Sequence, residues 1–194
     1  MIPVKKNFTV ILAIFIQQLS AQNILFTANF ENKKIDSSSW QIVTGNWRIC
    51  DVDEMRIAPA ENGYRYMLLS GGKGYTGDNI IRLIVDLPDS LKAKKIKLSF
   101  SYYILANVMG TKIEVEFIQK EIKDGRRGVL WVDLLRRVKG KWTAYQKTVN
   151  VPAGANSVYI TFFGFKSSGD KDRMVCFDNI AVSWINQFIK KTTE

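Results

Sequence analysis

The chain has 194 residues, of which 46% are hydrophobic and 24% charged, and its 28 basic and 18 acidic residues give a formal net charge of +10. This composition excludes a disordered or low-complexity chain and predicts one compact domain. Histidine is absent and there are two cysteines, which excludes a four-ligand zinc site and a histidine general base.

The first residues have the order of a secretory signal peptide. Lys5 and Lys6 precede an uncharged apolar run, Phe8–Ile16, about half the roughly 20 residues that a membrane helix needs. Polar residues follow, and the small residue Ala21 marks the expected cleavage point. We therefore expect residues 1–21 to be a signal peptide, the mature protein to be secreted or held at the cell surface, and no membrane span to remain in it. The alternative is that the apolar run is a buried first strand or helix of the fold.

The rest of the chain alternates apolar and polar residues in short runs, as strands with one buried face do. In chain order we expect strands at Ile24–Glu31, Trp40–Thr44, Asn46–Cys50, Tyr66–Ser70, Ile80–Leu87, Ile96–Phe100, Ile113–Phe117, Leu130–Leu135, Tyr145–Val149, Val158–Phe162 and Val175–Ser183. Val129–Val138 also fits a helical face, and we assign it to a strand. Turn-forming stretches such as Asp124-Gly125 separate the runs. The pattern predicts an all-β, two-sheet antiparallel sandwich over residues 22–184 and a short tail at 185–194.

Basic residues are scattered over predicted strands and turns, as at Lys95, Lys97, Arg136 and Arg137. Solvated strand faces explain this scatter, and a nucleic-acid module with aromatic platforms is not apparent, so we expect no nucleic-acid partner. An anionic polysaccharide or a lipid headgroup surface is the alternative for the positive charge.

The two cysteines, Cys50 and Cys176, lie in an early and in the last predicted strand. In an exported domain such a pair is a candidate for one disulfide, which would join the two ends of the domain. The alternative is two separate buried thiols, which behave as small apolar side chains.

A resemblance covers most of the chain from Phe26 to Ser183. Its residues, in order, are Asn29-Phe30-Glu31, Trp40, Gly45-Asn46-Trp47, Leu98-Ser99-Phe100-Ser101-Tyr102, Ile113-Glu114-Val115, Trp131, Trp142 and Phe177-Asp178-Asn179-Ile180. This order resembles the MAM-like jelly-roll modules, relatives of galactose-binding-like and carbohydrate-binding domains. The segment ending Ser20-Ala21-Gln22 is similar to exported segments of Bacteroidota. The chain departs from the family at Asn29 and Asn179, where acidic residues are usual, and it lacks the full cysteine set of animal MAM domains.

The resemblance implies a jelly roll whose first and last strands lie near each other. It also implies a structural calcium ion beside these strands, with Glu31 and Asp178 as carboxylate donors and Asn29 as a helper. Alternatively, both carboxylates face solvent or accept hydrogen bonds from nearby backbone.

Sugar-binding modules of this shape present aromatic rings and planar polar groups on a sheet face or a loop rim. The candidates are Tyr64, Arg65, Tyr66, Tyr75, Tyr102, Asn107 and Trp131. Tyr75, within Gly74-Tyr75-Thr76-Gly77, is the preferred rim aromatic. We expect Trp40, Trp47 and Trp142 to pack in the core.

These features predict a secreted, non-catalytic module that binds carbohydrate or a cell-surface glycan. The first alternative is protein adhesion or assembly at the cell surface. A minor alternative is a sandwich-fold glycoside hydrolase, because Glu114 and Glu116 share one face of a predicted strand. Position 118 is Ile, so the extended acidic run of such hydrolases is incomplete, and we expect no enzyme activity.

Overall fold

The computed structural model describes residues 22–60, 66–70, 78–89, 95–105, 110–119, 128–138, 140–164 and 174–185. These residues form the short helix α1, Val52–Met55, and strands β1 Gln22–Ala28, β2 Trp40–Thr44, β3 Trp47–Asp51, β4 Tyr66–Ser70, β5 Ile80–Asp86, β6 Lys95–Ile104, β7 Gly110–Ile118, β8 Gly128–Arg136, β9 Thr143–Asn150, β10 Ser157–Phe163 and β11 Val175–Ile185. The predicted signal peptide, 1–21, and residues 186–194 of the predicted tail lie outside the described residues.

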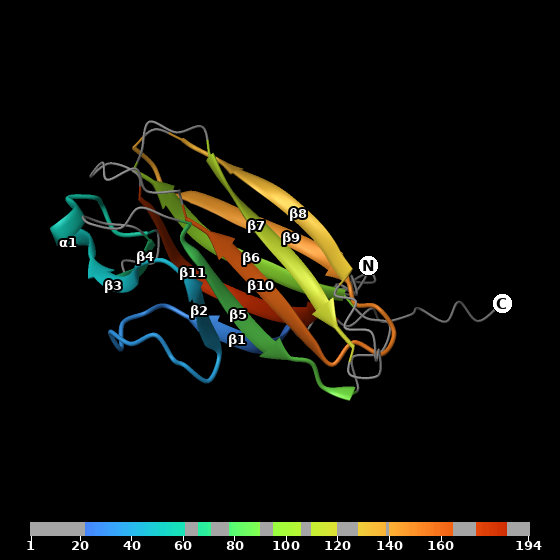
Figure 1. Cartoon of the computed structure of the whole chain (residues 1–194). Helices are drawn as coiled ribbons and strands as arrows, with labels where there is room; N and C mark the ends of the chain where they lie inside the picture. The colour runs from blue at the N-terminus through green and yellow to red at the C-terminus, as the bar shows by residue number, and fades with distance from the viewer. Residues whose placement is uncertain are drawn as a thin grey trace, which may run out of the picture.

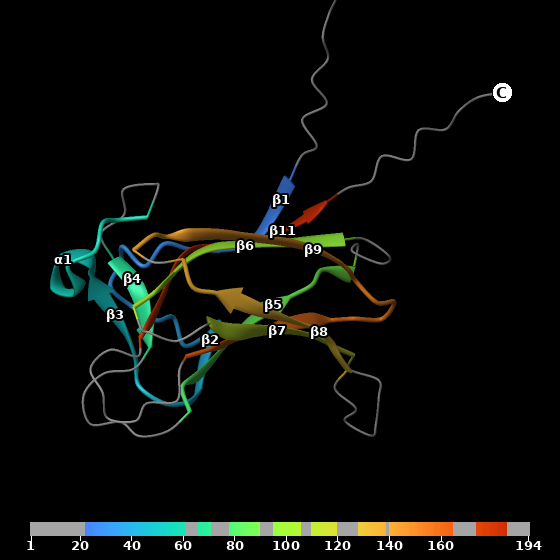
Figure 2. The same ribbon diagram turned by 90° about the horizontal axis from the view of Figure 1, so that it is seen from above.

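The strands form two antiparallel sheets that face each other as the layers of a sandwich (Figure 1). Sheet A has the order β3-β4-β11-β6-β9, with β1 also paired to β11, and sheet B has the order β2-β5-β10-β7-β8. Figure 2 shows the two layers from above. The predicted all-β sandwich is confirmed, and the ambiguous segment after residue 128 is the strand β8.

The core lies between the sheets because alternate residues of each central strand point inward. In β6, Ile96, Leu98 and Phe100 are at most 3% exposed. The Phe162 ring of β10 meets the Phe177 ring of β11 at 4.9 Å between centroids in an edge arrangement, so these two rings join the sheets at their centre. Trp40 and Trp47 are 5% and 6% exposed, which confirms their core assignment.

A second, smaller cluster lies on the outer side of sheet A. It contains Cys50, Val52 and Cys176, covered by partly buried apolar side chains that include Met55 and Trp142. The indole Nε1 of Trp142 donates to the Ala58 carbonyl at 2.7 Å, which holds the segment after α1 against the sheet. The expectation that Trp142 packs in the main core is therefore wrong, because its ring packs against this outer cluster.

The predicted disulfide is also wrong, since Cys50 and Cys176 are buried free thiols. Their strands are not neighbours: β4 lies between β3 and β11 and pairs with both. Two inter-strand spacings amount to about 9–10 Å, whereas a disulfide requires Cα atoms within about 7 Å. The strand Tyr66–Ser70 was predicted from the sequence, but its place between β3 and β11 was not.

We predict that both thiols resist modification until the protein unfolds. Burial raises the pKa of the Cys50 thiol to about 11, and the hydrogen bond with Glu54 adds to the rise, so the reactive thiolate is scarce near neutral pH. With an aromatic disulfide reagent at pH 8, the native protein should react slowly. The chain unfolded in guanidinium should react quickly at both thiols. An unfolded chain with no reactive thiol would show that the bridge forms after all.

Candidate functional site

Most of the predicted sugar-binding residues cannot be placed on a surface. Tyr64, Arg65, Tyr75 and Asn107 lie outside the described residues, and Tyr66 begins β4, paired with Asp51. Tyr102 is 6% exposed, and its hydroxyl donates to the Arg136 carbonyl at 2.9 Å. Tyr102 is a core residue of β6, so the prediction that it presents a ring to a ligand is wrong.

The remaining candidate, Trp131, lies where the edge strands β8 and β9 face each other across the sandwich. Its ring is 6.1 Å from the Tyr145 ring, and the Lys147 ammonium is 5.2 Å from the centre of the indole ring. The Tyr145 hydroxyl donates to Asp133 at 3.1 Å, and Lys147 lies 3.9 Å from the same carboxylate oxygen. Burial raises the pKa of Tyr145, and the Asp133 charge adds to the rise. These contacts close the side of the sandwich, and they leave Trp131 in a mainly structural role.

A different group of aromatic and polar side chains lies on the outer face of sheet B. In β10, Val158, Ile160 and Phe162 are fully buried and point inward, so Tyr159, Thr161 and Phe163 point outward. We use the name outer β10 face for these three residues together with their neighbours Arg82 of β5 and Lys112 and Glu114 of β7. The Tyr159 and Phe163 rings are four residues apart on one strand, or about 13 Å.

Each ring of the outer β10 face has a cation beside it. The Arg82 guanidinium carbon is 5.1 Å from the Tyr159 ring centre, and its Nε donates to the Thr161 hydroxyl at 3.3 Å. The Lys112 ammonium is 4.1 Å from the Phe163 ring centre and donates to Glu114 at 2.7 Å. Rings, planar donors and carboxylate acceptors are thus combined on one sheet face, which is the chemistry that binds the apolar faces and hydroxyl groups of a sugar.

The two glutamates considered for catalysis differ in their surroundings. Glu114 is ion-paired with Lys112, and its side chain is 25% exposed. Glu116 points to the same face of β7 and is 8% exposed. The ion pair of Glu114 favours a binding role for this carboxylate over that of a catalytic acid.

Tyr159 and Phe163 are not among the site residues predicted from the sequence. The signal that could have found them is two aromatic residues on the polar side of a strand whose other side, Val158, Ile160 and Phe162, is fully apolar. Their neighbour Arg82 is distant in sequence and is brought beside Thr161 by the pairing of β5 with β10.

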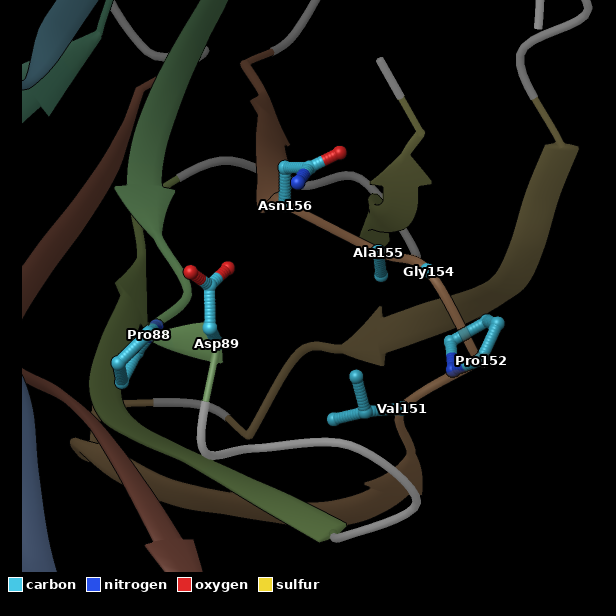
Figure 3. Close-up of a pocket in the computed structure, with 7 residues that line it drawn as sticks. All are labelled: Pro88, Asp89, Val151, Pro152, Gly154, Ala155 and Asn156. Carbon is cyan, nitrogen blue, oxygen red and sulfur yellow. The ribbon is translucent and has the colours of Figure 1, made fainter. Parts of the chain in front are cut away.

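A small hollow of about 50 Å³ lies between the β5–β6 connection and the β9–β10 turn. Figure 3 shows Pro88 and Asp89 on one side and Val151, Pro152, Gly154, Ala155 and Asn156 on the other. Typical ligand pockets measure about 300–1,000 Å³, so this hollow is too small to enclose a sugar ring.

The predicted calcium residues lie where β11 changes its partner from β4 to β1. Asp178 is 1% exposed, and its carboxylate accepts the Asn179 backbone N–H at 2.7 Å. Burial raises the pKa of Asp178 to about 7, against that hydrogen bond, and the Glu31 charge adds to the rise. The Asn29 side-chain oxygen accepts the Glu31 N–H at 3.3 Å.

The donor atoms of these residues are of the type that a hard cation prefers. Their number is smaller than calcium needs. Two carboxylates and an amide are all oxygen ligands, as calcium prefers, but calcium takes six to eight. Among the described residues no group of three or more acidic, cysteine or histidine side chains has metal-binding spacing. Backbone carbonyls and water would have to supply the remaining ligands.

Within the described part of the chain, no helix has the length and apolar character needed to cross a membrane.

Comparisons with known proteins identify proteins that share the fold of this chain, but they do not assign the chain to a family. No protein-family model and no curated protein matches the chain. Among solved structures, the enzymatically active domain of tailspike protein 4 of bacteriophage CBA120 has a TM-score of 0.60 and 14% identity, covering 84% of this chain. The chain spans only 21% of the length of that tailspike chain.

Two whole domains are also similar. The CBM22-2 xylan-binding domain from Paenibacillus barcinonensis Xyn10C has a TM-score of 0.53 and 16% identity, covering 82% of this chain and 98% of that domain. The K2 cleaved adhesin domain of Lys-gingipain has a TM-score of 0.55 and 16% identity, covering 83% of this chain and 99% of that domain. The MAM-like part of the resemblance stays a prediction. This chain has the two-sheet jelly-roll sandwich fold that these two domains share.

Proposed function

We propose that this chain is a non-catalytic carbohydrate-binding module and that the outer β10 face is its binding surface. The observation that carries the proposal is the pair of rings, Tyr159 and Phe163, on the outward side of the central strand of sheet B. Arg82, Lys112 and Glu114 flank these rings and supply hydrogen-bond donors and an acceptor for hydroxyl groups. The xylan-binding domain with the same fold is consistent with this function.

Loss of either ring should weaken glycan binding. We expect Tyr159→Ala and Phe163→Ala each to lower the affinity for a soluble polysaccharide about tenfold, or roughly 1.4 kcal/mol, because each removes a stacking surface. Affinity electrophoresis with xylan, galactan, mannan and mixed-linkage glucan would measure the change. The control is Tyr103→Ala, which removes a ring from the outer cluster of sheet A and should leave affinity unchanged. Equal losses in all three variants would contradict the assignment of the surface.

The proposal also includes export, with the mature chain beginning at Gln22 outside the cell or on its surface. N-terminal sequencing of the protein from culture medium and membranes tests this part. A bound polysaccharide should gain no reducing ends on long incubation, since we assign no catalytic acid.

We further propose that a calcium ion binds between Glu31 and Asp178 and stabilises the junction of β1 and β11. Its support is the buried Asp178 carboxylate beside a second negative charge, an arrangement that a cation would offset. Millimolar calcium should raise the midpoint of thermal unfolding by a few degrees over the value in chelator. Glu31→Gln should abolish that increase, and an unchanged midpoint in the wild-type protein would remove the ion from the proposal.

Protein adhesion is the second candidate function. It is favoured by the edge strand β8, where Val132 is 49% and Leu134 is 68% exposed, because an exposed apolar edge strand can pair with another chain. Cell adherence that Leu134→Lys abolishes, together with no binding to any polysaccharide, would favour this candidate over glycan binding.

A further inference from the structure

Arg82 lies beside the Tyr159 ring of the outer β10 face, and most of its hydrogen-bond donors are uncommitted. Its side chain is half-buried, and its Nε atom donates to the Thr161 hydroxyl at 3.3 Å. A guanidinium has five N–H donors, so the other four belong to the two terminal nitrogens, Nη1 and Nη2. Among the described residues, no side-chain or backbone oxygen accepts from these four donors. The planar end of the Arg82 guanidinium therefore has donors to offer a ligand.

Lys112, the second cation of the outer β10 face, has a different arrangement, since its ammonium lies 2.7 Å from the Glu114 carboxylate. Within the described ranges, no carboxylate forms a salt bridge with Arg82. Strand order gives the reason for Glu114 and Glu116. Both lie on β7, and β10 separates β7 from β5, so their backbones are two inter-strand spacings, about 9–10 Å, from that of β5. The face itself thus supplies no anion to Arg82.

The chemistry beside Arg82 fits an anionic group at the edge of a sugar ring. The Arg82 guanidinium carbon is 5.1 Å from the Tyr159 ring centre, so a sugar in contact with Tyr159 has an edge within reach of Nη1 and Nη2. The planar fork of these nitrogens matches the two oxygens of a carboxylate. In a hexuronic acid the carboxylate stands at the edge of the pyranose ring and leaves an apolar face for stacking. One sugar unit can therefore make both contacts.

Charge also orients such a sugar on the outer β10 face. Glu116 lies directly opposite Tyr159 on β7, and like charges repel, so the acidic edge of the sugar points toward β5 and Arg82. The hydroxyl groups of the other edge then point toward β7, where the Glu114 carboxylate is an acceptor. The whole chain, with a net charge of +10, attracts polyanions through its long-range field. Local and long-range electrostatics thus favour the same class of ligand.

We propose that the outer β10 face binds acidic saccharides, with the anionic group of one sugar unit held by Nη1 and Nη2 of Arg82 while its ring stacks on Tyr159. The proposal rests on the carbohydrate-binding function proposed above and names the ligand class of that same surface. The shared chemistry is an anionic group with two or more oxygens, which a uronic acid supplies as a carboxylate and a sulfated sugar as a sulfate ester.

Matched pairs of ligands test the role of the anionic group. Polygalacturonate and its fully methyl-esterified form have the same sugar chain, but only the first carries carboxylates. Dextran sulfate and dextran make the same comparison for a sulfate ester. Calorimetric titrations at about 0.15 M salt screen most charges beyond about 8 Å. The wild-type protein should bind one acidic form about tenfold more tightly than its neutral counterpart, and the pair that shows this preference identifies the anionic group.

Variants at Arg82 test whether this residue holds the anionic group. Arg82→Gln should lower the affinity for the preferred acidic form about tenfold, and it should leave the affinity for the neutral counterpart within about twofold. Arg82→Lys keeps the charge without the fork, so it should stay at least about threefold weaker than the wild type toward the acidic form.

Lys97→Gln is the matched control, because it makes the same change in net charge on the other sheet. Lys97 lies in β6 between the inward-pointing residues Ile96 and Leu98, so it belongs to the outer side of sheet A. This variant should leave the affinities for the acidic and the neutral form within about twofold of the wild-type values.

The outcomes separate the ligand class from the carbohydrate-binding function. If the wild-type protein binds none of these chains and none of the neutral polysaccharides named above, the function fails and the ligand class falls with it. If it binds the neutral forms as tightly as the acidic ones, the function stands and the role of Arg82 is wrong. Equal losses in Arg82→Gln and Lys97→Gln would assign acid binding to net charge. A loss in Arg82→Gln that is equal for both forms would show a structural role, and either result would overturn the proposal.

Discussion

Replacing Phe177 by alanine is expected to lower the free energy of unfolding by about 3–5 kcal/mol, the largest effect of any single change considered. The Phe177 side chain is fully buried, and its ring lies 4.9 Å from Phe162 and 5.8 Å from Phe100 between centroids. It also stacks on Trp47 at 6.3 Å. The variant leaves a cavity lined by three rings from different strands, which those rings cannot fill without moving the sheets. Urea unfolding followed by tryptophan fluorescence measures the loss.

Leu134→Ala is the control for Phe177→Ala. Leu134 is 68% exposed on the edge strand β8, so its truncation should change the free energy of unfolding by less than about 0.5 kcal/mol. Since domains are stable by about 5–15 kcal/mol, Phe177→Ala should leave a measurable unfolded population at modest urea. A loss below 1 kcal/mol would mean that the sheets are not joined through this ring.

The second large effect is a pH dependence caused by Asp178. Because burial raises the pKa of Asp178 to about 7 in the folded protein, while an unfolded Asp titrates near 3.9, the folded state holds an extra proton between these values. Stability from this group is complete below about pH 4 and is lost as pH rises through 7. A shift of this size corresponds to at most about 4 kcal/mol. Urea unfolding in chelator at pH 4.5 and 7.5 measures the difference.

Asp178→Asn should flatten this pH dependence, because the amide does not titrate. Asp86→Asn, which changes an exposed carboxylate of β5, should leave it as in the wild type. Saturating calcium should reverse the slope for the wild-type protein, since the ion binds the deprotonated carboxylate. A wild-type stability that rises between pH 4.5 and 7.5 in chelator would show that Asp178 is ionised in the folded state.

The strands could be predicted because the alternation of each one records its own burial. In β6 the buried residues Ile96, Leu98 and Phe100 alternate with half-buried ones, and this period of two is visible in the sequence itself. Trp40 and Trp47 were expected in the core from the resemblance to jelly-roll modules and not from alternation, since the residues that follow Trp40 in β2 are exposed on both faces. The segment β8 was assigned to a strand, although Leu130, Leu134 and Leu135 fit a helical face as well.

The strands that lie next to each other in a sheet could not be predicted, because the residues of one strand do not determine which other strand pairs with it. The insertion of β4 between β3 and β11 separates Cys50 from Cys176. No residue pattern in β3 or β11 predicts this insertion. The outer β10 face depends on the same kind of information, since Arg82 and Thr161 meet only through the pairing of β5 with β10. Tyr159 and Phe163 were not predicted, because the aromatic candidates came from loops and from other strands.

The pairing of β1 with β11 has a practical consequence for this molecule. Gln22 lies opposite Ile185, so both ends of the described sandwich emerge side by side from sheet A (Figure 2). The outer β10 face belongs to the other sheet. A tag, a bead or a further domain joined at either end would therefore leave that face directed away from the point of attachment, and copies joined end to end could all contact one polymer at once.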